Sequence, residues 1–296
     1  MKKKIVIGTW PTSGDWGSND ISEVVNLYAK SFYEYGFYEY DTAPNYGNGF
    51  SEFLLGKIFE NEKVKINTKV GNLPFDQKSF EEDDIKISID QSLKRLNRSS
   101  INILFLHNPR NEIKDYDKII NLLNDYKSSG VIKGYGISCA KGFDYEKFTS
   151  LEKFEYVQDD INLLCLDKII KYKKNNYYAR SPLASGLLSG KINKSTIFEK
   201  SDHRSEWLYD ERLNSLIDRI EAIKEISGED IIDISSRFLL HSPKIDKVIF
   251  GIRKISHLDR LNNIKDSSPL KVKMVNDIFQ LYKNDFGLTG KEHLKY

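Results

Sequence analysis

Cysteine is scarce in this sequence. The 296 residues include only two, Cys139 and Cys165, which lie far apart and form no Cys-x-x-Cys pair. Small disulfide-stabilised proteins and structural zinc sites need more cysteines at closer spacing. We therefore expect neither disulfides nor a zinc site, and we expect the protein to function in the reducing cytoplasm.

Long apolar runs are also absent. A membrane helix needs about 20 consecutive apolar residues, and no stretch of this chain approaches that length. The first residues, three lysines followed by Ile5, Val6 and Ile7, begin like a signal peptide, but Gly8 and Pro11 interrupt the apolar run. We expect no association with a membrane and a first strand near Ile5.

Neither sign of charge dominates. The chain has 45 Lys and Arg residues against 43 Asp and Glu, for a net charge of +2, and the two signs are interspersed. Nucleic-acid-binding proteins usually carry a clustered basic patch, so we expect no nucleic-acid partner. No stretch rich in Pro, Gly or Ser divides the chain, and residues 1–296 are therefore predicted to form a single domain.

Several familiar catalytic signatures are missing. There is no Gly-x-Ser-x-Gly nucleophile motif, and the histidines show no His-Glu-x-x-His spacing for zinc. We expect neither a serine hydrolase nor a bound metal. The two partial Gly-x-Gly motifs also fail as Rossmann fingerprints, because Glu52 and Cys139 stand where the third glycine is needed. Any dinucleotide would have to bind by other groups.

The sequence does contain a regular alternation of strand-like and helix-like segments. Apolar stripes at helical spacing occur in residues 21–32, 85–96 and 119–126 and in a C-terminal segment around 272–282. Residues 192–210 fit neither pattern and predict a long loop after the seventh strand. The predicted strands begin near Ile5, Phe37, Val64, Ile103, Gly134, Tyr156, Tyr177 and Val248. Eight such units favour a (β/α)8 barrel of the α/β class, although the alternation alone also allows an open doubly wound sheet.

Four ionisable residues lie at or just past the ends of successive predicted strands: Asp41, Tyr46, Lys69 and His107. Singly, each has an ordinary explanation as a turn, cap or packing residue. In a parallel barrel, however, the carboxyl ends of the strands meet at one mouth, where such folds carry out chemistry. The four together therefore predict an active site.

This pattern resembles the aldo-keto reductases, whose catalytic tetrad is Asp, Tyr, Lys and His in that order. The resemblance runs from Gly8 to about Asn263 and includes Gln158 with Asn162, and residues 136–138 (GIS), 181–191 (SPLASGLLSGK) and 251–253 (GIR). It implies a (β/α)8 barrel and the NADPH-dependent reduction of an aldehyde or ketone, sugars included. Family members usually begin with a short hairpin below the barrel, which is shortened or absent in this chain, so other groups must cover the barrel floor.

The tetrad suggests how the reaction would proceed. Tyr46 is the expected general acid, and a neighbouring Lys69 ammonium is expected to lower its pKa from about 10. Asp41 would hold Lys69 charged and oriented. His107 would hydrogen-bond the substrate oxygen and orient the carbonyl.

The resemblance also implies a cofactor site. The nicotinamide carboxamide would lie at Ser138, Gln158 and Asn162, the pyrophosphate at Ser181, Leu183 and Ser185, and the adenosine phosphate at residues 251–253. Arg253 and Lys254 are both basic where the family contacts the ribose 2′-phosphate, which favours NADPH over NADH. The full predicted cofactor-binding set is Thr9, Trp10, Ser138, Gln158, Arg180, Ser181, Leu183, Ser185, Gly251, Ile252, Arg253, Lys254, His257 and Asn262.

The chain departs from the family pattern at three positions. Cys139 stands where an Asn commonly helps to hold the carboxamide, Arg180 where many members stack an aromatic ring on the nicotinamide, and Leu261 where an Asn often touches adenine. A guanidinium can stack on a ring face, so we expect Arg180 to replace the aromatic residue and Asn262 to cover the adenine.

Three questions stay open at this stage. Trp10, Trp16 and Trp207 form either an aromatic wall for the substrate or loop packing against the barrel rim. The same resemblance also fits a cofactor-binding regulatory or scaffold protein with little turnover, or an enzyme that modifies one specialised sugar. The sequence predicts a small-molecule carbonyl substrate and a monomer or weak homo-oligomer, but gives neither the substrate itself nor the direction of reaction.

Overall fold

Parallel strands form a closed barrel in this protein. The computed structural model describes residues 2–17, 19–110, 112–139, 152–171, 176–200, 202–288 and 295–296. Eight strands pair in sequence order, and β1 closes the barrel against β8. They are β1 Ile5–Gly8, β2 Glu39–Asp41, β3 Lys65–Val70, β4 Ile103–His107, β5 Tyr135–Ser138, β6 Tyr156–Asp160, β7 Tyr177–Arg180 and β8 Lys247–Gly251. The predicted barrel is confirmed and the open sheet is excluded.

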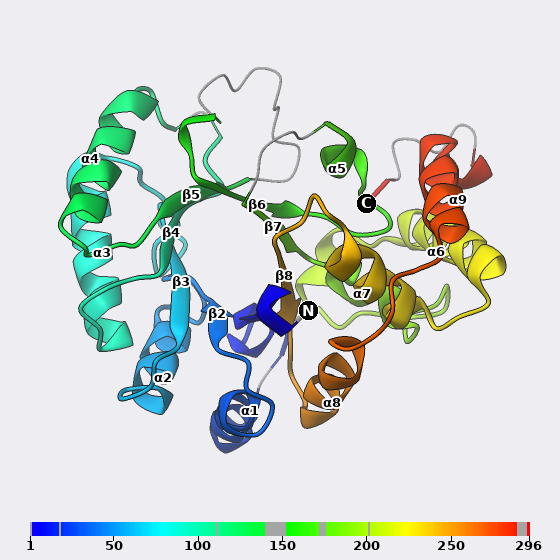
Figure 1. The fold of residues 1–296 in the computed structure, drawn as a ribbon, viewed down its shortest axis with the longest axis horizontal. Coiled ribbons are helices and arrows are strands. Elements are labelled where there is room, and N and C mark those ends of the chain that lie inside the picture. The colour runs from blue at the N-terminus through cyan, green and yellow to red at the C-terminus, as the bar shows by residue number, and fades with distance from the viewer. Residues whose placement is uncertain are drawn as a thin grey trace.

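Helices surround the strands, with α1 to α4 around one half of the barrel and α6 to α9 around the other (Figure 1). Their bounds are α1 Ile21–Tyr33, α2 Phe50–Ile58, α3 Glu82–Leu96, α4 Tyr116–Ser128, α5 Asp167–Lys171, α6 Asp210–Ser227, α7 Ile231–His241, α8 Ile255–Ile264 and α9 Val272–Lys283. Short 3-10 turns occupy Lys2–Lys4, Trp10–Thr12, Ala184–Ser189, His203–Glu206 and Asp285–Gly287. The described part of the predicted long loop contains a 3-10 turn, at His203–Glu206.

Local sequence explains where α1 begins, ends and packs. The Asp20 side chain accepts a hydrogen bond from the backbone N–H of Glu23, which satisfies a donor that the first turn leaves free. Val24 and Leu27, on the predicted apolar stripe, are buried. After the helix the chain must reverse, and Gly36 adopts a φ of 63° that side chains disfavour.

The N-terminal end of the barrel is closed by side chains from the strands. Residues 2–4 form a turn that leads directly into β1, and no hairpin precedes β1 among the described residues. Glu39, at the start of β2, is buried and lies 2.5 Å from Lys247 Nζ at the start of β8. Its other oxygen accepts hydrogen bonds from Asn67 Nδ2 (3.1 Å) and Tyr178 Oη (3.0 Å). We refer to Glu39, Asn67, Tyr178 and Lys247 as the floor cluster.

Apolar side chains fill the barrel between this floor and the mouth: Val6, Ile103, Phe105, Tyr178 and Ile249. The interior is therefore a packed core, and a ligand can bind only at the mouth. Within the described part of the chain, none of the helices combines the length and apolar character needed to span a bilayer.

Candidate active site

The predicted tetrad residues meet at the mouth of the barrel. Asp41 and His107 are the last residues of β2 and β4, Lys69 lies near the end of β3, and Tyr46 follows β2 in a loop. Lys69 Nζ donates to Asp41 Oδ1 at 2.6 Å and lies 3.4 Å from Tyr46 Oη. The rings of Tyr46 and His107 are 6.0 Å apart and nearly perpendicular. The structure thus brings all four side chains into one cluster.

The pKa of Tyr46 lies above its ordinary value of 10.0. Burial raises it, Lys69 lowers it, Asp41 raises it and Arg180 lowers it, and burial prevails. Lys69 thus lowers the pKa of this phenol, as expected, but burial outweighs it, so the phenol is not unusually acidic in this structure. The Asp41 carboxylate, which lies closer to the ammonium than the phenol does, adds to the effect of burial. Tyr46 is thus a protonated phenol, as a proton donor must be.

Lys69 is charged in this cluster, whereas His107 is neutral. Burial alone would lower the pKa of Lys69, but Asp41 and Tyr46 outweigh it, so the pKa lies above its ordinary value and the ammonium persists. Burial, assisted by the Lys69, Arg180 and Lys78 cations, holds the pKa of His107 well below 6.5. His107 is therefore neutral. Its buried Nδ1 has no hydrogen-bond partner among the described residues, which leaves a ring nitrogen for a ligand.

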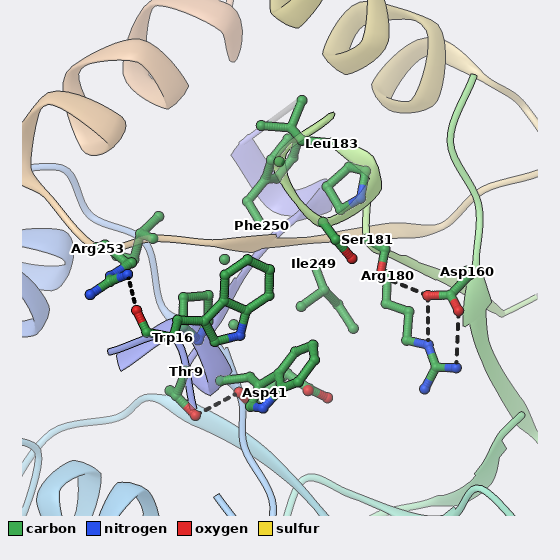
Figure 2. Close-up of a pocket in the computed structure, with 18 of the residues that line it drawn as sticks. Thr9, Trp16, Asp41, Asp160, Arg180, Ser181, Leu183, Ile249, Phe250 and Arg253 are labelled. Atoms are coloured by element: carbon green, nitrogen blue, oxygen red, sulfur yellow. Dashed lines mark hydrogen bonds and ion pairs between the residues drawn. The ribbon is translucent and has the colours of Figure 1, made fainter. Parts of the chain in front are cut away.

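A cavity of about 1320 Å³ opens in front of the tetrad (Figure 2). This volume exceeds that of typical drug-sized ligand sites, about 300–1,000 Å³, and suits an extended ligand beside a small one. Eleven predicted cofactor residues line it: Thr9, Trp10, Gln158, Arg180, Ser181, Leu183, Ser185, Gly251, Ile252, Arg253 and His257. Among the described lining residues, Ser138, Lys254 and Asn262 do not appear. Ser138 is buried behind Gln158, and Asn262 Oδ1 instead accepts from Lys265 Nζ.

The predicted nicotinamide end is tightly hydrogen-bonded within the protein. Ser138 Oγ donates to Gln158 Oε1 at 3.0 Å, and Gln158 Nε2 donates to Asp41 Oδ2 at 2.8 Å. Arg180 is paired with Asp160, Nε to Oδ1 at 3.1 Å (Figure 2). The carboxamide-binding groups are thus linked directly to the tetrad.

The loop after β7 forms the middle of the cavity wall. Ser181 and Ser185 both adopt positive φ values, of 52° and 53°. Ser181 Oγ donates to Asp160 Oδ1 at 2.7 Å, and Ser185 Oγ lies 3.2 Å from the phenol oxygen of Tyr296. Tyr296 also packs edge-on against Trp207, with ring centroids 5.9 Å apart. A C-terminal residue therefore reaches the loop on which the pyrophosphate is expected.

The predicted adenosine end lies at the start of α8. Arg253 donates from Nη1 to the Trp16 carbonyl at 2.6 Å (Figure 2). Its Nη2 donates to Asn19 Oδ1 at 3.2 Å. Its guanidinium therefore joins the end of β8 to the loop after β1. Because a helix N-terminus favours anions, Arg253 and the first turn of α8 together suit a phosphate group.

Aromatic rings line the cavity beside the tetrad. Trp10 stacks over Tyr46, with centroids 6.3 Å apart, and meets Trp16 edge-on at 5.3 Å. His203 packs against both indoles, at 5.0 Å and 4.6 Å. Two of the three predicted tryptophans thus form one wall, while Trp207 lines another part of the cavity beside Tyr296.

Sequence reasoning missed several residues of this site. Asp160 ends β6 two positions after Gln158, so the rule that singled out Asp41, an acidic group at a strand end, would also have found it. Asn108 directly follows His107 and lines the cavity. His203 and Tyr296 lie in no strand-end pattern, and no local signal marks them. Among the described residues, no cluster of His, Cys, Asp or Glu is arranged to hold a metal ion.

The closed barrel, with an ammonium, a phenol and an imidazole at its mouth, has the arrangement that the sequence resemblance implies. The sequence profile of the aldo/keto reductase family matches residues 4–283, and the chain therefore belongs to that family of oxidoreductases. It is similar to aldo-keto reductase YhdN of Bacillus subtilis, with 25% identity over 281 residues that cover 88% of this chain and 84% of the relative. It is also similar to aflatoxin B1 aldehyde reductase member 2 of Rattus norvegicus, with 25% identity over 86% of this chain and 78% of the relative.

Solved structures show the same fold. The glycerol dehydrogenase AKR11B4 from Gluconobacter oxydans aligns with a TM-score of 0.78 and 23% identity, covering 95% of this chain and 91% of that one. The holo form of aldo-keto reductase AKR11C1 from Bacillus halodurans aligns with a TM-score of 0.73 and 19% identity, covering 94% and 91%. At these identities the likeness concerns the barrel architecture.

Proposed function

We propose that this protein is an NADPH-dependent reductase of an aldehyde or ketone, sugars included, in which Tyr46 donates the proton. The observation that carries the proposal is the buried Lys69 ammonium, 2.6 Å from Asp41 and 3.4 Å from the Tyr46 phenol, at the base of a large cavity. Family membership supports carbonyl reduction in general.

The residues present fit a nicotinamide dinucleotide. The cavity has sufficient volume, and the buried Nδ1 of His107 lacks a partner among the described residues. Gln158 would hold the carboxamide, Ser181 and Ser185 the pyrophosphate, and Arg253 the 2′-phosphate. When bound, the nicotinamide supplies the hydride. Arg253, which lines the cavity, supports the choice of NADPH, because NADH has no 2′-phosphate for its guanidinium to bind.

The protein's own groups would handle the substrate oxygen. Neutral His107 positions the carbonyl by a hydrogen bond, and the protonated Tyr46 gives its proton to the oxygen as negative charge develops there. The phenolate that Tyr46 becomes is stabilised by Lys69, which Asp41 holds in place. Trp10 lies stacked over Tyr46 on the same side of the cavity.

Replacing Tyr46 by Phe tests the proposal. We expect Tyr46→Phe to lower kcat by at least about 100-fold on a panel of aldehydes, ketones and keto sugars, because the proton donor is lost. Cofactor affinity, followed by quenching of Trp fluorescence, should stay near that of the wild type and be tighter for NADPH than for NADH. Tyr209→Phe, which alters an exposed tyrosine, is the matched control.

Retained turnover in Tyr46→Phe would refute the assignment of the acid. If the wild type binds NADPH tightly but turns over no carbonyl on the panel, the regulatory or scaffold alternative gains support. Equal affinity for NADH would refute the proposed role of Arg253.

A further inference from the structure

Arg180 uses all of its hydrogen-bond donors at the mouth of the barrel. A guanidinium has five N–H groups and no acceptor. Nε donates to Asp160 Oδ1 (3.1 Å), Nη1 to Asn108 Oδ1 (3.1 Å) and Ser138 Oγ (3.0 Å), and Nη2 to the Cys139 carbonyl (2.5 Å) and Asp160 Oδ2 (3.4 Å). Arg180 therefore ties together the ends of β4, β5, β6 and β7.

This arrangement decides which way the neighbouring hydrogen bonds run. Because Arg180 can only donate, Ser138 Oγ must accept from it, and the single Ser138 proton is then given to Gln158 Oε1, 3.0 Å away. That bond fixes the Gln158 amide, with its oxygen toward Ser138 and its Nε2 donating to Asp41 Oδ2 at 2.8 Å. The other oxygen of Asp41 is left for Lys69.

We propose that Arg180 is a positioning residue for the reaction: through Ser138 and Gln158 it fixes the Asp41 carboxylate, and through Asp41 it holds Lys69 at the Tyr46 phenol. The inference rests on the proposed function and adds to it a residue that is an aromatic ring in many aldo-keto reductases. The ties to Asp160 and Cys139 hold the guanidinium in place, and the Asp160 carboxylate offsets its charge. Arg180 therefore offers no free N–H to a substrate anion.

The effect of Arg180 on the tetrad is also electrostatic. Its cation is one of the groups that lower the pKa of Tyr46 and that of His107. Loss of Arg180 would therefore make the Tyr46 phenolate harder to form. Its effect should appear in the chemical step more than in cofactor binding.

A double-mutant cycle tests the inference. We compare Arg180→Met, Ser138→Ala and the double variant with the wild type, measuring kcat and the NADPH dissociation constant. Each single variant should lower kcat about 10-fold while the dissociation constant changes by less than about threefold. The double variant should be no slower than the slower single variant, because both changes interrupt the same chain. Arg237→Met, outside the site, is the matched control.

Two further variants distinguish the loss of the Arg180 hydrogen-bond donors from the loss of its side-chain packing. Arg180→Lys keeps a donor with no acceptor and should retain most of kcat, whereas Arg180→Gln introduces an acceptor and should not. Additive losses in the double variant would overturn the inference. So would a rise of more than about tenfold in the NADPH dissociation constant at unchanged kcat, which would instead indicate that Arg180 stacks on the nicotinamide.

A measurement without turnover keeps this test separate from that of the proposed function. In protein labelled with ¹³C at the tyrosine Cζ, the Tyr46 resonance is identified by its loss in Tyr46→Phe. We expect Arg180→Met and Ser138→Ala to shift this resonance in the same direction, with no further shift in the double variant. An unchanged resonance in both single variants would overturn the inference even if the wild type proves to be an active reductase.

Discussion

At the scale of single residues, the most important contact is the pairing of Lys69 with Asp41. The carboxylate lies 0.8 Å closer to the ammonium than the phenol does, from distances of 2.6 Å and 3.4 Å, and together with the burial of the phenol it keeps Tyr46 neutral. The Lys69 ammonium stabilises the Tyr46 oxygen most strongly once the phenol has given up its proton, and charge that develops during the reaction is the charge a catalyst should stabilise. This arrangement therefore differs from one in which Lys69 already makes the phenol acidic before the reaction.

This difference predicts the pH dependence of reduction. His107 must stay neutral, and its lowered pKa means that it is protonated only below pH 6.5. Tyr46 must stay protonated, and its raised pKa means that it loses its proton only above pH 10.0. We therefore expect kcat for reduction at saturating NADPH to vary by less than about twofold between these limits.

The measurement is a series of steady-state rates across that range, with protein stability checked at each pH. A fall in kcat that begins near pH 8 would mean that Lys69 outweighs burial and brings the pKa of Tyr46 below its ordinary value. The effect of burial on the pKa of Tyr46 would then be outweighed in the complex with cofactor and substrate. The distances in this structure would not describe that complex.

How far the sequence predicts the site depends on where each residue's partners lie. Asp41 and Lys69 were identified because each stands at a strand end, and barrel geometry brings strand ends together. The contacts of Arg180 could not be predicted, because its partners lie on three other strands and their distances depend on the barrel's stagger. We expected the Arg180 guanidinium to stack on the nicotinamide, which stays a prediction, and the structure adds the hydrogen bonds that hold it within the protein.

At the scale of elements, the alternation of strands and helices was predictable and their close contacts were not. Predicted strand starts differ from the observed ones by at most two residues, at β2, which begins at Glu39 rather than Phe37. The spacing of the apolar residues along the sequence indicates where the strands and helices lie. The sequence does not reveal how closely two helices approach, and α2 and α3 approach closely at Gly56.

We therefore expect alanine at position 56 to destabilise the protein, the opposite of its effect in an open helix. In an open helix Gly→Ala gains about 1 kcal/mol, because alanine is the better helix former. At Gly56 an added Cβ would lie 2.5 Å from the Arg95 carbonyl oxygen and 2.6 Å from the Leu96 carbonyl carbon, both backbone atoms of α3. We expect Gly56→Ala to lower the free energy of unfolding by about 1–3 kcal/mol, measured by urea denaturation.

Lys57→Ala is the matched control, since Lys57 is exposed on the same helix. It should change stability by less than about 0.5 kcal/mol. A stabilised Gly56→Ala would show that α2 can move away from α3 at little cost.

At the scale of the whole molecule, the two ends of the barrel serve different purposes. The mouth gathers charged groups around the Tyr46 phenol, the proposed proton donor, whereas the floor cluster joins β2 to β8 and links both to β3 and β7. The sequence predicted that something must replace the usual hairpin, but the identity of the replacement could not be predicted. It depends on which inward-facing polar side chains meet across the barrel, and alternation along one strand does not give their depth.

The floor cluster should support stability without affecting the reaction. Lys247→Met would leave the buried Glu39 carboxylate without its cation, and we expect the free energy of unfolding to fall by about 3 kcal/mol. Adding Glu39→Gln should recover at least half of that loss, because the uncompensated charge is then removed. Urea denaturation gives the stabilities, and kcat should stay within about twofold of the wild type, since the cluster lies at the opposite end of the barrel from Tyr46. Two results would contradict this prediction: a Lys247→Met variant as stable as the wild type, or a double variant less stable than the single one. Either would show that the ion pair does not hold the floor closed, and that Asn67 and Tyr178 suffice to solvate the Glu39 carboxylate.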